Sequence, residues 1–167
     1  TLPGTDIHGF AQDPFTPSRL FAFVVGSGTF TSAGDGTTWE PLPSQPPGGG
    51  MHLALAAFGG SLYAAAGDAI VISRDQGVSW EPLPAQPGGE VISLAIATSD
   101  PEILYVGTAN GLAKSTDGGT SWTELGPEGV PALALATSPI DANRVWFISD
   151  TGDVYRSDDG GATWRSA

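Results

Sequence analysis

Short runs of apolar and small residues, often alternating with polar ones, recur along the whole chain between clusters of glycine and proline. Runs bounded by turn residues in this way are typical of β-strands. No window shows the sustained 3.6-residue apolar period of an amphipathic helix. The pattern therefore predicts an all-β chain with almost no helix.

The predicted strands fall into four units with the same plan. In the third unit they cover residues 91–98, 103–107, 112–115 and 122–125, and Asn110-Gly111 predicts a tight turn. The corresponding strands of the first unit are 7–12, 20–25, 29–32 and 39–42. Those of the second are 52–57, 62–66, 69–73 and 80–83, and those of the fourth are 132–137, 145–149, 153–157 and 164 onward. We place the units at residues 5–43, 51–84, 90–126 and 130–167.

An eight-residue box follows the third strand of each unit. It runs Ser-Arg-Asp-Gln-Gly-Val-Ser-Trp at 73–80, Ser-Thr-Asp-Gly-Gly-Thr-Ser-Trp at 115–122 and Ser-Asp-Asp-Gly-Gly-Ala-Thr-Trp at 157–164. A looser copy, Ser-Ala-Gly-Asp-Gly-Thr-Thr-Trp, occupies 32–39. The closing tryptophans recur about every 42 residues. A fixed period of this size indicates a repeat architecture.

First strands are rich in alanine, whereas second strands begin with a large apolar pair such as Leu104-Tyr105 or Val145-Trp146. Small residues suit a strand crowded near a central axis, and large ones fill the wider space between radial sheets. Successive four-stranded sheets of this kind predict a β-propeller. We expect four-stranded antiparallel blades, four of them in this chain, with residues 1–167 as a single propeller or half-propeller domain.

The residue types of the box predict a turn that is stapled by its own side chains. Ser and Asp two positions apart can bond backbone N–H groups, Gly permits positive φ, and Trp supplies a large ring with one N–H donor. We therefore predict structural roles for Ser32, Asp35, Gly36 and Trp39, for Ser73, Asp75, Gly77 and Trp80, for Ser115, Asp117, Gly119 and Trp122, and for Ser157, Asp159, Gly161 and Trp164.

The pattern Ser-x-Asp-x-Gly-x-Thr/Ser-Trp resembles the Asp-box, or BNR repeat, of sialidases, sortilin-type receptors and photosystem assembly factors. Residues 6–14 are also similar to the opening of bacterial BNR-repeat, glycosylhydrolase-like proteins. The resemblance implies a propeller whose boxes are structural and lie away from any catalytic face. The first box departs from the pattern, because Gly34 stands at the Asp position and Asp35 follows it, so we expect an altered turn there.

The net charge of the chain limits the classes of partner that we expect. The chain has 18 acidic and 6 basic residues, a formal net charge of −12, and no cysteine. Such a surface repels nucleic acid and anionic lipid, so we expect neither as a partner. No apolar run is long enough to span a bilayer. Because the chain begins at Thr1 rather than Met, we expect that an upstream segment was removed and that the protein is exported.

Candidate catalytic groups are better explained by structural roles. The sialidase Phe/Tyr-Arg-Ile-Pro motif is missing, and the arginines recur at fixed repeat positions, which predicts turn and edge roles for Arg19, Arg74, Arg144, Arg156 and Arg165. The carboxylates that a glycoside hydrolase would need, Asp6, Asp68, Asp150 and Asp153, all adjoin glycine or turns. We predict no metal and no cofactor. His8 and His52 remain as ligand-binding candidates, although they fall at different positions of the repeat.

These observations leave three hypotheses for function. The first is a non-enzymatic binding or scaffold propeller with a protein or glycan ligand, and the sequence favours it over an enzyme. The second is a glycoside hydrolase-like enzyme of the sialidase type, and the third is a propeller fragment or engineered repeat without a native ligand. Little chain follows Trp164, and residues 1–3 resemble the tail of a fourth strand. A closed ring of four blades, a homodimer of eight and a piece of a longer propeller all fit, and we favour self-association.

Overall fold

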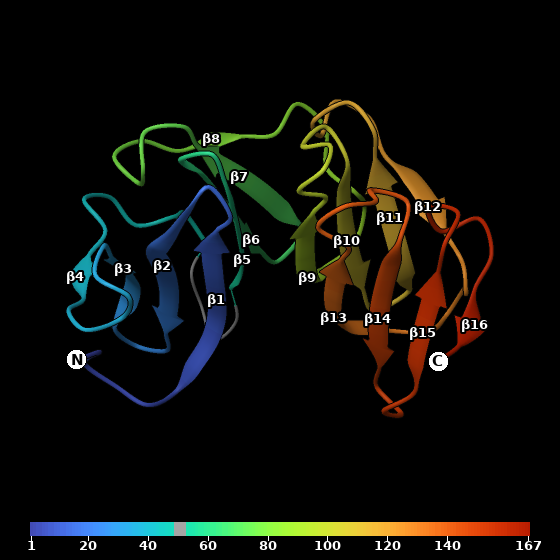
Figure 1. The fold of residues 1–167 in the computed structure, drawn as a ribbon, viewed down its shortest axis with the longest axis horizontal. Helices are drawn as coiled ribbons and strands as arrows, with labels where there is room; N and C mark the ends of the chain where they lie inside the picture. The colour runs from blue at the N-terminus through green and yellow to red at the C-terminus, as the bar shows by residue number, and fades with distance from the viewer. Residues whose placement is uncertain (49–52) are drawn as a thin grey trace. The chain divides into compact units, whose positions relative to one another are not determined.

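The described part of the computed structural model, residues 1–48 and 53–167, consists of strands and turns without a helix. The strands form four antiparallel sheets of four strands each (Figure 1). Both features confirm the predicted class, an all-β chain with four propeller blades. Within these residues no helix exists that could cross a bilayer.

Each blade is one consecutive set of four strands. Blade 1 contains β1 (Ile7–Asp13), β2 (Thr16–Val24), β3 (Gly28–Ser32) and β4 (Glu40–Pro41). Blade 2 contains β5 (Ala54–Phe58), β6 (Ser61–Ala66), β7 (Ala69–Ser73) and β8 (Glu81–Pro82). Blade 3 contains β9 (Val91–Ile96), β10 (Leu104–Thr108), β11 (Gly111–Ser115) and β12 (Thr123–Leu125). Blade 4 contains β13 (Ala132–Thr137), β14 (Val145–Ser149), β15 (Val154–Ser157) and β16 (Arg165–Ser166).

Most predicted boundaries lie within two residues of the observed ones. The largest shift is in β2, which starts at Thr16 rather than residue 20 because the chain reverses tightly at Pro14-Phe15. The predicted start of the second unit, at residues 51–52, lies outside the described residues. Each box tryptophan precedes the fourth strand instead of opening it, so the ring belongs to the turn and the fourth strand is short.

Two compact units divide the chain, Thr1–Pro82 with blades 1 and 2 and Leu83–Ala167 with blades 3 and 4. In the first unit, Phe21 and Phe23 of β2 pack against Leu55 and Leu62 of blade 2. A Cβ placed on Gly9 would lie 2.3 Å from the carbonyl oxygen of Leu53. A larger residue would therefore hold the two sheets apart at this point.

Asp13 joins the two blades of the first unit by a buried carboxylate. Its side chain is 2% exposed and accepts hydrogen bonds from the backbone N–H groups of Phe15, Gly59 and Gly60 at 3.0, 3.2 and 3.0 Å. The guanidinium of Arg19 lies 4.0 Å from it. A buried charge persists only when it is paired and hydrogen-bonded, so Asp13 fixes the β5–β6 turn of blade 2 to the end of β1.

The second unit repeats this close approach with other residues. The hydroxyl of Ser93 on β9 donates to the carbonyl of Ala132 on β13 at 2.8 Å. A Cβ on Gly107 would lie 2.3 Å from that same carbonyl oxygen. Phe147 and Tyr155 of blade 4 stack with ring centroids 4.7 Å apart and face Leu112 of blade 3. Tyr155 thus lies against the core, as its position before a box indicates.

Candidate functional site

The three regular boxes share one set of hydrogen bonds, and Asp117 shows it fully. Its Oδ1 accepts from the hydroxyl of Ser115 at 2.8 Å and from the backbone N–H of Ser121 at 2.8 Å. Its Oδ2 accepts from the hydroxyl of Ser121 at 2.6 Å. The Ser115 oxygen in turn accepts from the N–H of Gly119 at 2.8 Å. Both carboxylate oxygens are therefore committed to holding the turn.

These bonds favour the ionised carboxylate. Hydrogen bonds from Ser79 lower the pKa of Asp75 from 3.8 to about 2, and those from Thr163 lower the pKa of Asp159 to about 2. The hydroxyl and N–H of Ser121 likewise lower the pKa of Asp117. The box aspartates are thus poor proton donors at neutral pH, and their chemistry is that of turn staples.

The first box has a different turn, because the carboxylate is displaced by one position. Ser32 Oγ still accepts from the N–H of Gly36 at 3.0 Å, but Gly34 supplies no acceptor side chain. Thr37 instead donates through its hydroxyl to the Gly34 carbonyl at 2.6 Å. Asp35 is exposed, has φ of 53°, and makes no hydrogen bond through its carboxylate within the described residues. Its side chain is available to a partner.

Two of the boxes also form a pair of hydrogen bonds with the chain segment directly after the preceding blade. We call this pair of bonds the lock. Trp80 Nε1 donates to the carbonyl of Ser44 at 3.0 Å, and the Ser44 N–H donates to the carbonyl of Gly77 at 2.8 Å. Trp122 and Gly119 make the same pair of bonds with Ala85, both at 3.0 Å. The acceptor in each case lies five residues after the previous box tryptophan, so the repeat period itself positions the lock.

The lock is incomplete at the fourth box. Position five after Trp122 is Pro127, which has no N–H to donate to Gly161. Trp164 Nε1 is buried there without a hydrogen-bond partner in the described structure. Trp39 in the first box donates to the Gly36 carbonyl of its own turn at 3.0 Å. The four tryptophans are therefore not equivalent, although the motif around them is nearly constant.

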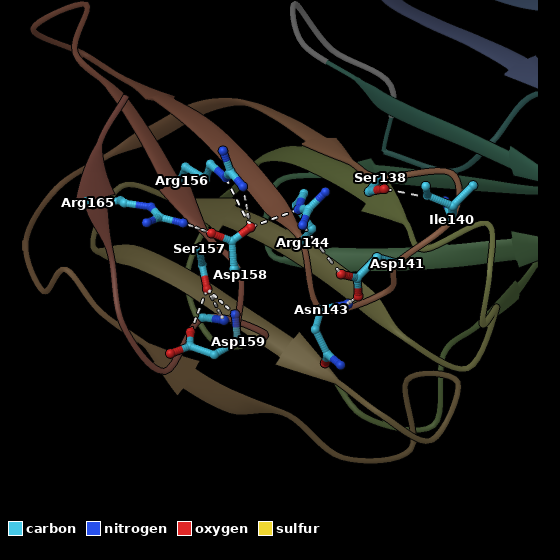
Figure 2. A network of polar contacts seen from close by, with 11 residues as sticks. Ser138, Ile140, Asp141, Asn143, Arg144, Arg156, Ser157, Asp158, Asp159 and Arg165 are labelled. Carbon is cyan, nitrogen blue, oxygen red and sulfur yellow. Dashed lines mark hydrogen bonds and ion pairs between the residues drawn. The ribbon is translucent and has the colours of Figure 1, made fainter.

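Three arginines of blade 4 converge on Asp158 (Figure 2). Arg144 Nε and Arg156 Nη2 donate to Oδ1 at 2.8 and 2.6 Å, and Arg165 pairs with Oδ2. Arg144 also lies 4.0 Å from Asp141. The guanidinium of Arg156 stands 5.8 Å from the ring centroid of Trp146. In a chain with net charge −12, this cluster concentrates positive charge on one blade.

The sequence pattern placed these arginines separately at turns and edges and missed that they form one cluster. The sequence feature that could have revealed the cluster is the strand register. Arg156 is the last residue but one of the third strand and Arg165 comes directly after Trp164, so the hairpin around the box puts the two residues opposite each other. Trp146 lies opposite Arg156 on the other side. Asp158 occupies a variable position of the box, which is why the motif did not mark it.

A pocket of about 530 Å³ opens in the second unit beside the β10–β11 turn. Its polar lining includes Asn110, Glu124 and Glu128, together with the glycine-rich backbone of the turn and of the segment after β12. The N–H of Gly129 donates to the Asn110 carbonyl at 2.8 Å, which fixes the turn to that segment. The volume is in the range of small-ligand sites.

One repeat position distinguishes this pocket from the equivalent end of blade 1. There Gln45, six residues after Trp39, accepts from the N–H of Thr29 at 2.6 Å and donates to its carbonyl at 3.1 Å. The same position in blade 3 is Glu128, which cannot donate in this way. Its carboxylate is exposed and makes no hydrogen bond or ion pair with the described residues. It can therefore accept hydrogen bonds from a ligand.

Of the two histidine candidates, His8 lies within the described residues. His8 is exposed on β1, with Nε2 2.9 Å from Asp6 Oδ1, and His52 lies outside the described residues. Asp153 accepts from the hydroxyl of Thr151 at 2.7 Å in a turn. The described residues hold no cluster of three or more potential metal ligands. None of these groups forms a paired catalytic arrangement with another in the described structure.

Comparison with protein families assigns the chain. The DUF6242 beta propeller domain matches residues 18–138, more than half of the sequence. The chain belongs to this family. A BNR/Asp-box repeat also matches residues 155–166 of this DUF6242 propeller, over the fourth box. No curated protein matches its sequence.

Solved structures share the fold at low identity. A GH74 xyloglucanase from Xanthomonas campestris is 20% identical with a TM-score of 0.68, covering 93% of this chain and 28% of its own. The extracellular domain of a one component system from B. thetaiotaomicron is 14% identical with a TM-score of 0.69, covering 99% and 22%. YCF48 bound to D1 peptide is 15% identical with a TM-score of 0.54, covering 96% and 81%.

These likenesses establish the propeller fold of the DUF6242 chain. The chain spans 28% of the length of the xyloglucanase and 22% of the length of the extracellular domain. At this identity and coverage, fold alone is shared, and it assigns neither an activity nor a partner to this chain.

Proposed function

We propose that the chain is a non-enzymatic binding domain that takes a glycan in the pocket beside Asn110, Glu124 and Glu128. The observation that carries this is the replacement of the Gln45 type of residue by Glu128. At this position of the repeat, blade 1 has an amide that is hydrogen-bonded to the backbone of Thr29. Blade 3 has a carboxylate that makes no hydrogen bond with the described residues. Carboxylate and amide groups at the rim of a shallow pocket suit a ligand rich in hydroxyl groups.

The comparisons support a binding role in two ways. One structure of the same fold is a xyloglucanase, which acts on a glycan, and another was solved with a bound peptide. The likeness to an extracellular domain supports our further proposal that the chain works outside the cytoplasm. A peptide ligand is the second possibility, and calorimetry with glycans separates the two.

Titration calorimetry with xyloglucan oligosaccharides and other neutral glycans tests the proposal. We expect binding by the wild-type chain and a loss of affinity of about tenfold or more in Glu128→Gln, because a charged acceptor is replaced by a neutral amide oxygen that accepts weaker hydrogen bonds. Glu90→Gln is the matched control, since Glu90 is exposed in the same unit and does not line the pocket. Equal losses in both variants, or no binding of any glycan, would contradict the proposal.

Hydrolysis assays on the same glycans and on aryl glycosides address the enzymatic alternative. We expect no release of reducing ends above that of buffer. Turnover that disappears in Glu124→Gln and Glu128→Gln, or in Asp6→Asn or Asp150→Asn, would identify a glycoside hydrolase instead. Such carboxylates would then act as a general acid and its partner.

A further inference from the structure

An aspartate stands directly before a glycine at three places in the chain, and all three lie inside boxes: Asp35-Gly36, Asp117-Gly118 and Asp159-Gly160. In such a pair the backbone nitrogen of the glycine can attack the side-chain carboxyl carbon of the aspartate and close a five-membered ring. Glycine has no Cβ to hinder this approach. Because the three pairs share one sequence, the structure around each pair decides whether it reacts.

Hydrogen bonds hold the side chain of Asp159 away from this reaction. Its Oδ1 accepts from the hydroxyl of Ser157 at 2.7 Å and from the backbone N–H of Thr163 at 2.9 Å, and its Oδ2 accepts from the Thr163 hydroxyl at 2.6 Å. Asp117 makes the same three kinds of bond in its own box. Ring closure at either residue therefore has to break bonds to both carboxylate oxygens.

The same bonds also keep these two carboxylates ionised. Those from Thr163, above all, lower the pKa of Asp159 to about 2, and the pKa of Asp117 is lowered in the same way. A carboxyl group loses its OH as water only when it is protonated, so the ionised form does not close the ring. The attacking nitrogen is held as well, because the Gly160 N–H donates to the Asn143 carbonyl at 2.8 Å.

Asp35 lacks the restraints on its carboxylate. It is exposed, and its side chain makes no hydrogen bond with the described residues. Its φ of 53° is unfavourable for a residue with a Cβ, whereas the same position of the box is glycine at Gly118 and Gly160. The nitrogen of Gly36 donates to a hydroxyl of its own turn, Ser32 Oγ, at 3.0 Å. The carboxyl carbon of Asp35 can therefore approach this nitrogen without breaking any bond of its own side chain.

We propose that Asp35 is a site of spontaneous modification, at which the folded chain converts aspartate into isoaspartate while the other two Asp-Gly pairs stay intact. The difference arises because the regular boxes bind their aspartates through both carboxylate oxygens and the first box does not. The inference does not depend on the pocket beside Glu128.

The conversion needs no reactant other than water. The Gly36 nitrogen attacks the protonated carboxyl of Asp35, a C–N bond forms, and the carboxyl OH leaves as water with the proton of that nitrogen, which gives a succinimide. Water then adds to one carbonyl of the ring and breaks its bond to the nitrogen. Hydrolysis at the side-chain carbonyl restores aspartate, and hydrolysis at the backbone carbonyl leaves Gly36 joined through the side chain, as isoaspartate.

Isoaspartate at this position alters the first box. The conversion inserts one carbon atom into the backbone directly before Gly36 and leaves a free carboxylate on the Cα of residue 35. Gly36 makes two bonds of that turn, since its N–H donates to Ser32 Oγ and its carbonyl accepts from Trp39 Nε1, both at 3.0 Å. Both bonds therefore have to rearrange when the residue before Gly36 is converted.

Peptide mapping of the aged, folded chain tests the proposal. Trypsin places the three pairs in separate peptides, residues 20–74, 115–144 and 157–165, and electron-transfer fragmentation distinguishes isoaspartate from aspartate. After incubation in mildly acidic buffer we expect isoaspartate at Asp35 to exceed that at Asp159 by about tenfold or more, because a pKa of about 2 in place of 3.8 alone lowers the protonated fraction of Asp159 by more than this factor.

Two controls connect the preference to the fold. In a chain aged in concentrated urea the three pairs should react at similar rates, because the protecting bonds are lost. Ser121→Ala removes the 2.6 Å hydroxyl bond to Asp117 and should raise isoaspartate there while Asp35 reacts as before. Equal isoaspartate at all three pairs of the folded chain would overturn the proposal. So would a folded chain that keeps Asp35 intact over a period in which the unfolded chain converts it.

Discussion

At the scale of single residues, the box aspartates illustrate how an acidic chain uses carboxylates structurally. Asp75, Asp117 and Asp159 each accept hydrogen bonds from two hydroxyl groups and from backbone N–H groups of the same turn. The same bonds lower the pKa of these residues. They therefore stabilise the folded chain only while they are ionised.

The lowered pKa values predict how stability responds to acid. A carboxyl whose folded pKa is about 2 and whose unfolded pKa is 3.8 stabilises the fold above pH 3.8 and loses that contribution as the pH falls toward 2. The difference in urea midpoint between wild type and Asp159→Ala should thus be largest above about pH 5 and shrink toward about pH 2. Carboxyl-carbon NMR titration checks the pKa of Asp159 directly. A difference that stays constant across this range would contradict the prediction.

How far single residues could be predicted depended on whether their role was local. The box motif identifies Ser115 and Asp117 because their partners lie within six residues. Asp13 and Asp158 belong to no motif, since Asp13 caps a turn more than 40 residues away and Asp158 meets arginines from two strands and from the residue before a third. Their roles depend on register and blade packing, which a one-dimensional pattern does not contain.

At the scale of elements, the lock between consecutive blades depends on the residues directly after each fourth strand. Ser44 and Ala85 each supply one carbonyl and one N–H to the next box, whereas Pro127 has no N–H. Trp122 and Trp164 consequently differ in their bonding, although both rings belong to the second unit. This difference can be measured with a matched pair of variants.

We expect Trp122→Phe to lower the free energy of unfolding by about 1 kcal/mol more than Trp164→Phe. Both variants lose ring area, but only the first removes a hydrogen bond and leaves the Ala85 carbonyl without its donor. The difference corresponds to a thermal midpoint that is lower by roughly 2–4 °C. Differential scanning calorimetry of the two variants measures it, and identical midpoints would show that the lock contributes nothing.

Strand order was the most predictable level of the structure. Alternation and turn residues were enough to find all the strands, since each strand pairs with its neighbour in sequence. The shortness of the fourth strands was less visible, because Trp80 and Trp122 look like strand residues but point their N–H groups at the preceding segment. The pocket at Glu128 was not predicted. A single Gln-to-Glu difference between repeats does not indicate a binding site unless the hydrogen bonds of Gln45 are known.

At the scale of the whole molecule, the net charge opposes the association of two copies of the chain. Two bodies of charge −12 repel by about 20 kcal/mol at a separation of about 30 Å in unscreened water. An exposed ion pair contributes about 1 kcal/mol or less. Long-range repulsion therefore dominates at low ionic strength, and salt at about 0.15 M reduces its range to about 8 Å.

This balance predicts an unusual salt dependence for any self-association of the chain. Self-association should strengthen as sodium chloride rises from about 0.01 M to about 0.15 M, because screening removes more repulsion than attraction. Sedimentation velocity at fixed protein concentration across this range measures the effect. A dimer that weakens steadily with added salt would mean that the short-range pairs outweigh the net charge.

The locks made by Trp80 and Trp122 have a consequence for how such a gene can change. Each lock joins the box of one blade to the segment between that blade and the preceding one, so the chain has a direction, and both bonds of a lock are made within one repeat period. Tandem duplication or deletion of one whole period leaves the remaining locks intact. The number of repeats can thus change without the need for new contacts. Single substitutions such as Gln to Glu or Gly to Asp then give individual repeats different surface groups.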